Sequence, residues 1–153
     1  MRRALASVAL LVVAATAGPA TSGPPVARGE AATPASVRLV HCTPQAREAA
    51  FEGRMWQIAA GQRMSLRFRL LERTGSERFR VVDAPGLGRW RWSRAGVREF
   101  GYRQGVRGLA AGAVYRVRVD YRWHAADGRP LKRARRRSAP CRQPTRADRR
   151  YHR

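Results

Sequence analysis

The sequence predicts an all-β protein, an antiparallel sandwich of about seven strands that follows a signal peptide. Three observations lead to this fold class. Apolar and polar residues alternate over several short segments, turn sequences separate these segments, and the N-terminus has the composition of an export signal. Seven short strands in roughly 100 residues are typical of a β-sandwich.

Residues 1–17 are predicted to be a Sec-type signal peptide. Arg2 and Arg3 form a basic n-region, residues 4–14 are uncharged and mostly apolar, and Ala15 and Ala17 supply the small residues that signal peptidase accepts. A membrane-spanning helix needs roughly 20 apolar residues, which is more than this segment has. We therefore expect a secreted, extracellular protein with no transmembrane segment in its mature chain.

Composition divides the rest of the chain into three parts. Residues 18–36 are rich in Gly, Pro and Ala and are predicted to be a disordered spacer, because they cannot bury enough apolar surface to fold. Residues 37–143 are long enough for one hydrophobic core and are predicted to be the folded domain. Residues 144–153 are polar and basic and are predicted to be a disordered tail.

Seven segments are expected to be strands. The clearest are 64–70 and 115–123, in which large apolar side chains share one face and arginines share the other. The same alternation in 78–81 predicts that Phe79 and Val81 face the core. The remaining strands are expected at 37–43, 49–56, 100–109 and 131–138, and turns that contain glycine lie between several of the seven.

Leu109, Gly112 and Tyr115 have the spacing Leu-x-x-Gly-x-x-Tyr, and a long alternating segment follows them. This motif resembles the tyrosine corner that opens the sixth strand of fibronectin type III and immunoglobulin-like (Ig-like) domains. The resemblance implies an Ig-like or fibronectin type III-like sandwich, in which Tyr115 is a structural corner residue whose hydroxyl bonds to upstream backbone. It also implies that the third, fourth, sixth and seventh strands share one sheet. Val117 stands where an immunoglobulin domain has cysteine, so no specific family is identified.

Cys42 and Cys141 are the only cysteines, and they are predicted to form a disulfide bond. They lie near the end of the first expected strand and just after the last one, and these ends can approach each other in a sandwich. A catalytic thiol paired with His41 is a weaker interpretation, because adjacent strand residues point to opposite faces. A metal site is not expected, since two cysteines and three scattered histidines offer too few ligands.

The charge of the chain is extreme, with 32 basic and 10 acidic residues and a net charge of +22. Lys132 is the only lysine. A GC-rich genome would favour arginine codons without any selection for binding. The alternative is that the surface binds polyanions, because the planar guanidinium group suits phosphate and carboxylate. Genome composition explains arginine in place of lysine, but it does not explain the scarcity of acids.

Enzymatic activity is not expected. The sequence has no Gly-x-Ser-x-Gly, P-loop or His-Glu-x-x-His motif. Asp120 lies among arginines, where an ion-pair partner is the better interpretation than a general acid. We therefore expect no catalytic residues and no cofactor.

Three tryptophans have an open interpretation. Trp90 and Trp92 alternate with arginines and could stack on sugars or bases. Since they share a parity, the preferred interpretation is that both face the core while the arginines face water. Trp56, in contrast, is expected to be exposed.

The outward residues of the strongest strands suggest a function. We expect a secreted, non-enzymatic binding module for an anionic surface or polymer, such as cell-wall polymer, acidic polysaccharide, lipid head groups or DNA. The alternative is a structural or protein-interaction Ig-like domain whose basic surface is incidental. The predicted polyanion-binding residues are Arg67, Arg69, Arg78, Arg80, Arg116, Arg118 and Arg122.

Overall fold

The computed structural model describes residues 34–60, 63–145 and 147, all within one compact unit. The predicted signal peptide, nearly all of the spacer and most of the basic tail lie outside these residues. The elements are all strands: β1 (Ala35–Thr43), β2 (Glu48–Trp56), β3 (Arg63–Thr74), β4 (Arg80–Val82), β5 (Arg91–Trp92), β6 (Glu99–Val106), β7 (Ala113–His124), β8 (Pro130–Arg137) and β9 (Cys141–Gln143). The predicted all-β class is confirmed.

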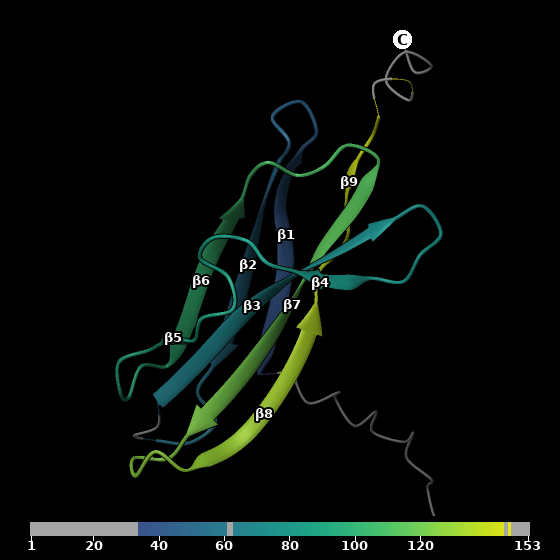
Figure 1. Cartoon of the computed structure of the whole chain (residues 1–153). Coiled ribbons are helices and arrows are strands. Elements are labelled where there is room, and N and C mark those ends of the chain that lie inside the picture. Colours follow the sequence, from purple (N-terminus) through teal and green to yellow (C-terminus); the bar gives the residue numbers. More distant parts are fainter. Residues whose placement is uncertain (1–33, 61–62, 146, 148–153) are drawn as a thin grey trace, which may run out of the picture. The chain divides into compact units, whose positions relative to one another are not determined.

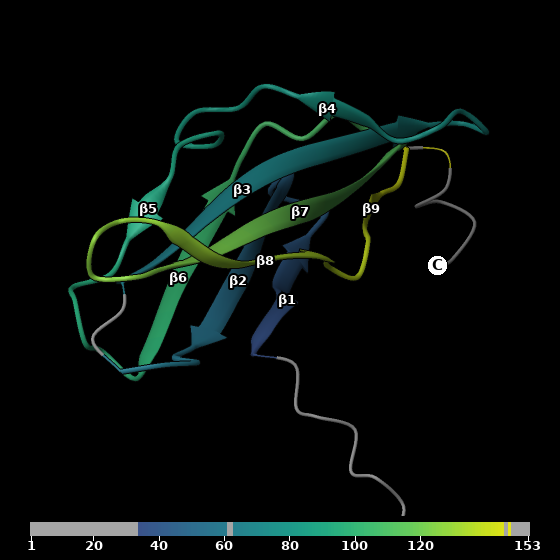
Figure 2. The ribbon, with the colours of Figure 1, turned by 90° about the horizontal axis from the view of Figure 1, so that it is seen from below.

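The nine strands form two antiparallel sheets that are stacked as two layers (Figures 1 and 2). The smaller sheet has the order β1-β2-β6. The larger sheet has the order β4-β3-β7-β8, with β5 also paired to β3 and β9 paired to β7. The four strands expected to share a sheet are therefore neighbours. Among the described residues, no helix is long and apolar enough to cross a membrane.

The core lies between the two sheets and follows the alternation of the sequence. On β3 the side chains of Met64, Leu66 and Phe68 are buried, and on β7 the odd-numbered residues from Tyr115 to Trp123 are buried. β3 and β7 pair along the full length of both strands. These two strands therefore form the centre of the larger sheet. Because their pairing has no register shift, the alternate residues of both strands face away from the core on the same side of the sheet.

β2 supplies the opposing wall of the core through Ala49, Phe51 and Met55, all of them buried. Gly53 has the same parity. A Cβ atom there would lie 3.1 Å from the hydroxyl of Tyr121 and 3.2 Å from Cζ of Phe68. The absence of a side chain at this position therefore allows the two sheets to approach.

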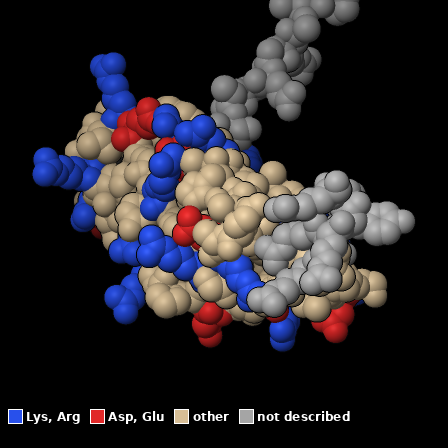
Figure 3. All heavy atoms as spheres, turned by 90° about the horizontal axis from the view of Figure 1, so that it is seen from above, with Lys and Arg blue, Asp and Glu red and all other residues tan. Residues whose placement is uncertain are grey.

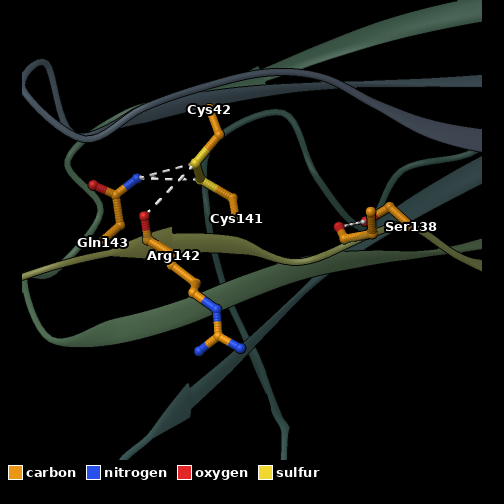
Figure 4. Close-up of a disulfide and its surroundings, with 6 residues drawn as sticks. Cys42, Ser138, Cys141, Arg142 and Gln143 are labelled. Atoms are coloured by element: carbon orange, nitrogen blue, oxygen red, sulfur yellow. Dashed lines mark hydrogen bonds between the residues drawn. A yellow bond between two sulfur atoms is a disulfide. The ribbon is translucent and has the colours of Figure 1, made fainter.

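A disulfide joins Cys42 of β1 to Cys141 of β9, with their Cα atoms 5.5 Å apart (Figure 4). The predicted bridge is confirmed. A register shift between Leu39 and His41 breaks the alternation of β1, so that Cys42 packs against the core while His41 is exposed. The amide of Gln143 points toward the two sulfur atoms, with Nε2 3.2 Å from Sγ of Cys141.

The predicted orientation of 78–81 is wrong. β4 begins only at Arg80, and Val82 is the residue that packs against the core. Val81 is 49 % exposed, and Phe79 lies beneath the guanidinium groups of Arg73 and Arg116. Four residues carry too little alternation to fix their parity, which is set here by the pairing of β4 with β3.

Candidate functional site

Arginines line the outward side of the larger sheet. Because the inward residues of β3 and β7 are apolar, the residues between them face away from the core, together with their partners on β8. The register places Arg69, Arg118 and Arg137 in one row across the three strands. We call this surface the arginine face. Its basic members are Arg63, Arg67, Arg69, Arg73, Arg116, Arg118, Arg122, Arg133, Arg135 and Arg137.

Asp120 is the one acidic residue at the outward positions of these three strands. Its Oδ2 accepts a hydrogen bond of 3.1 Å from Arg67, and its Oδ1 accepts one of 3.0 Å from Arg135. The Nε atoms of Arg69 and Arg118 lie 3.6 and 3.9 Å from the same carboxylate. The side chain of Asp120 is only 12 % exposed. Four guanidinium groups thus surround one negative charge, which leaves an excess of positive charge.

The arginines of this surface are crowded and incompletely solvated. Burial lowers the pKa of Arg118, although the charge of Asp120 acts in the opposite direction. Burial and the positive charge of Arg137 lower the pKa of Arg116. The Nε atoms of Arg67, Arg116 and Arg118 are buried and have no hydrogen-bond partner in the described part of the chain. An anion bound at this surface would reduce the repulsion between the guanidinium groups.

Trp90 and Trp92 lie on the arginine face and not in the core. β5 pairs with β3 so that Trp92 is opposite Ser65, which has an outward position. The Cζ atoms of Arg67 and Arg122 lie 4.5 and 4.2 Å from the centre of the Trp90 ring, within the range of cation–π contacts. Trp92 is 49 % exposed. The preferred prediction for these tryptophans is therefore wrong.

The reason is a long-range contact that fixes the register of β5. The backbone N–H of Ser93 donates to the carbonyl oxygen of Met64 at 2.8 Å, and the Met64 N–H donates to Oγ of Ser93 at 2.9 Å. This buried serine ties the segment to the start of β3 and turns the tryptophans outward. The sequence indicates that Trp90 and Trp92 point to the same side, but which side this is depends on the contact between Ser93 and Met64.

The arginine face contains a hollow of about 300 Å³. An indole, a carboxylate and several guanidinium groups meet there. The lining residues are Arg67, Trp90, Asp120, Tyr121, Arg122, Arg133, Ala134 and Arg135.

Five of the seven arginines predicted to bind polyanions lie on the arginine face, namely Arg67, Arg69, Arg116, Arg118 and Arg122. The other two do not. Arg78 precedes β4 and is outside any strand. Arg80 is paired with Glu72, on the side of β3 that carries Leu70, and donates a 2.8 Å hydrogen bond to the Glu72 carboxylate. The cause is the same reversed parity of β4 that places Phe79 outside the core.

The orientation of three further arginines, on the last long strand, could not be predicted from the sequence. The sequence of 131–137 has basic residues at both parities, so the pattern alone cannot tell which of them face outward. The pairing of β8 with β7 assigns Arg133, Arg135 and Arg137 to the arginine face.

The hydroxyl of Tyr115 is hydrogen-bonded to upstream backbone and to a carboxylate. Its hydroxyl accepts a hydrogen bond of 2.9 Å from the backbone N–H of Ala110 and donates one of 2.7 Å to the carboxylate of Glu72. The hydrogen bonds from Tyr115 and then from Arg80 hold the pKa of Glu72 below its ordinary value. Burial, and next the hydrogen bond to Glu72, raises the pKa of Tyr115. The hydrogen bonds of Glu72 with Tyr115 and Arg80 thus connect β3, β4 and β7.

Tyr115→Phe is expected to lower the free energy of unfolding by about 1–3 kcal/mol, because it removes two hydrogen bonds, one of them to a charged group. Denaturant unfolding at neutral pH measures the change. Tyr102→Phe is the matched control, since the described residues offer the Tyr102 hydroxyl no hydrogen bond; it is expected to leave the midpoint nearly unchanged. Equal midpoints for wild type and Tyr115→Phe would show that the corner contributes nothing.

A serine–histidine pair lies at one end of the arginine face. Oγ of Ser65 is 3.1 Å from Nε2 of His124, and Nδ1 of His124 is 3.2 Å from the carbonyl oxygen of Gly128. Ser65 is fully buried and the Trp92 ring packs on His124. A nucleophile needs access to its substrate, so this arrangement fits a structural hydrogen bond. No cluster of metal-ligating side chains occurs in 34–60, 63–145 or 147.

The outward side of the smaller sheet is electrostatically more balanced. Glu52 accepts a 2.6 Å hydrogen bond from Arg38, and Arg54 lies 3.3 Å from Glu52 and 3.2 Å from Glu99. Trp56 is 38 % exposed, as predicted. In Figure 3 basic side chains are spread over the visible surface, so positive charge alone does not mark a site. The arginine face differs in that four guanidinium groups surround the carboxylate of Asp120, whereas two lie close to that of Glu52.

Comparison with known proteins gives a weak structural likeness. No family model and no curated protein matches the chain. A crystal structure of a Bordetella pertussis protein provisionally named ApaA is similar at 18 % identity, over 72 % of this chain and 92 % of that chain, with a TM-score of 0.38. At this TM-score the likeness supports no statement about family or function.

Proposed function

We propose that this protein is a secreted, non-enzymatic binding module that holds an anionic polymer on the arginine face of an Ig-like sandwich. The observation that carries the proposal is the convergence of four guanidinium groups on the single carboxylate of Asp120, which leaves excess positive charge in a partly desolvated setting. Like charges at neighbouring positions destabilise a sheet. A polyanion would remove this unfavourable repulsion on binding.

Two observations support the other parts of the proposal. The disulfide is typical of an oxidising compartment, which agrees with export by the predicted signal peptide. The sheet order β4-β3-β7-β8 and the Tyr115–Ala110 hydrogen bond agree with an Ig-like or fibronectin type III-like arrangement.

The test compares two variants of equal net charge. The face variant replaces Arg69, Arg118, Arg133 and Arg137 by Gln, and spares the two arginines that hydrogen-bond to Asp120. The control variant replaces Arg38, Arg54, Arg103 and Arg107 by Gln, which lie on or beside the smaller sheet. Binding of inorganic polyphosphate and of polygalacturonate is measured between about 50 and 200 mM salt.

The face variant is expected to bind roughly tenfold more weakly at 150 mM salt and to show a flatter dependence of log K on log salt. The control variant is expected to lose less than about threefold, since its arginines are exposed and several are paired with acids. Equal losses in both variants would show that the charge acts diffusely. That outcome would favour the alternative of a structural or protein-interaction domain with an incidental basic surface.

A further inference from the structure

The hollow on the arginine face has the dimensions and chemistry of a subsite for one ring. Its volume of about 300 Å³ is at the lower end of small-ligand pockets. Binding of a polyanion to a flat basic surface would need only the arginines. The indole of Trp90 and the carboxylate of Asp120 are extra features, and they restrict which polyanion fits.

Asp120 separates two classes of ligand. The phosphate groups of a DNA strand or of polyphosphate have no hydrogen-bond donor for this carboxylate at neutral pH. Hydroxyl groups, in contrast, can donate hydrogen bonds to it. A carboxylate has about four acceptor positions, and Arg67 and Arg135 use two of them with their hydrogen bonds. The remaining capacity favours a ligand that brings hydroxyl donors together with anionic groups.

Trp90 supplies a rigid apolar surface at the same place. Its ring is held by the guanidinium groups of Arg67 and Arg122, at 4.5 and 4.2 Å, and it is only partly buried. The negative face of an indole attracts the polarised C–H groups of a sugar ring. Arg133 and Arg135 lie on the β8 side of the hollow and are exposed, where they can pair with a carboxylate or sulfate group.

We propose that this hollow binds one ring of an acidic polysaccharide. Trp90 packs against the C–H side of the sugar, Asp120 accepts a hydrogen bond from a hydroxyl, and Arg133 with Arg135 binds the carboxylate or sulfate. This inference rests on the polyanion-binding function proposed above and names its ligand class. Single-stranded nucleic acid and ring-free polyanions are the competitors to be tested.

The experiment measures binding of polygalacturonate, inorganic polyphosphate and oligothymidylate, at equal charge concentration and ionic strength, to the disulfide-bonded protein. Trp90→Ala is expected to weaken polygalacturonate binding about five- to tenfold and to leave polyphosphate binding unchanged. Trp90→Phe keeps an aromatic ring and is expected to retain most of the affinity. Trp92→Ala is the matched control, because Trp92 is only two residues from Trp90 in the chain but does not line the hollow. Unfolding midpoints establish that each variant is folded.

The possible outcomes are distinct. If all three polymers bind equally and Trp90→Ala changes none of them, the sugar subsite is excluded while the polyanion-binding function stands. If oligothymidylate binds best and depends on both Trp90 and Trp92, the ligand is a single-stranded nucleic acid and the inference is overturned. If no polymer binds more strongly to wild type than to the face variant, the proposed function itself fails.

Discussion

Replacing both cysteines by alanine is expected to lower the free energy of unfolding by about 2–5 kcal/mol. The bridge between Cys42 and Cys141 closes a loop of 99 residues, for which the loss of unfolded-state entropy alone amounts to about 4.7 kcal/mol. The folded state is also affected. β9 is three residues long and pairs with the start of β7, so without the bridge only a short ladder holds it.

Guanidinium chloride unfolding of oxidised wild type and of the double variant measures this difference. Reduced wild type should unfold at the same denaturant concentration as the variant, and reductant should not change the variant itself. Amide hydrogens of 141–143 should exchange faster in the variant, because β9 is released first. Coincident unfolding curves for oxidised wild type and the variant would mean that the bridge does not stabilise the domain.

Much of the fold could be predicted because the long strands have one apolar and one polar face. In β3 and β7 the alternation extends over 64–70 and 115–123, so the inward residues of these segments could be named. The disulfide followed from two cysteines at the ends of the domain. β5 and β9 could not be predicted, since two or three residues contain no measurable period and depend on partners distant in the sequence.

The candidate site was only partly predictable. The sequence identifies the outward residues of β3 and β7, but not the register between these strands and β8. That register brings Arg67 and Arg135 to the two oxygens of Asp120. Likewise, nothing near Trp90 in the sequence shows that Ser93 is tied to the backbone of Met64. Contacts across strands decide both features, and local pattern does not encode them.

Asp120→Asn is expected to lower the free energy of unfolding by about 2–4 kcal/mol at neutral pH, somewhat less than the loss of a partner in a fully buried ion pair. Burial raises the pKa of Asp120, but hydrogen bonds from Arg135 and Arg67 outweigh it, so that the folded-state pKa lies below the ordinary value. The stability from this carboxylate is therefore present above about pH 3.9 and is lost as the pH falls through the lower folded-state pKa.

Unfolding free energies measured from neutral pH down to about pH 2 test this prediction. The acid-induced loss of stability should be smaller in Asp120→Asn than in wild type. Glu52→Gln is the matched control, because Glu52 also binds two arginines, but these are 62 % and 45 % exposed. Its effect is expected to stay below about 1 kcal/mol, as for other surface ion pairs. Equal effects of the two substitutions would show that the arginine face does not depend on its central carboxylate.

The same substitution is expected to act on binding in the opposite direction. Removal of one negative charge beside a bound polyanion should strengthen the binding of inorganic polyphosphate by roughly fivefold, which corresponds to about 1 kcal/mol for one charge pair at contact in water. Polygalacturonate should gain less, because Asp120→Asn weakens the acceptor for a sugar hydroxyl while it removes the repulsion. Glu52→Gln, on the smaller sheet, should change neither affinity. If Asp120→Asn strengthens the binding of both polymers equally, Asp120 acts through its charge alone and makes no hydrogen bond to the sugar. If it weakens polyphosphate binding, its main role is to hold Arg67 and Arg135 in place for the ligand.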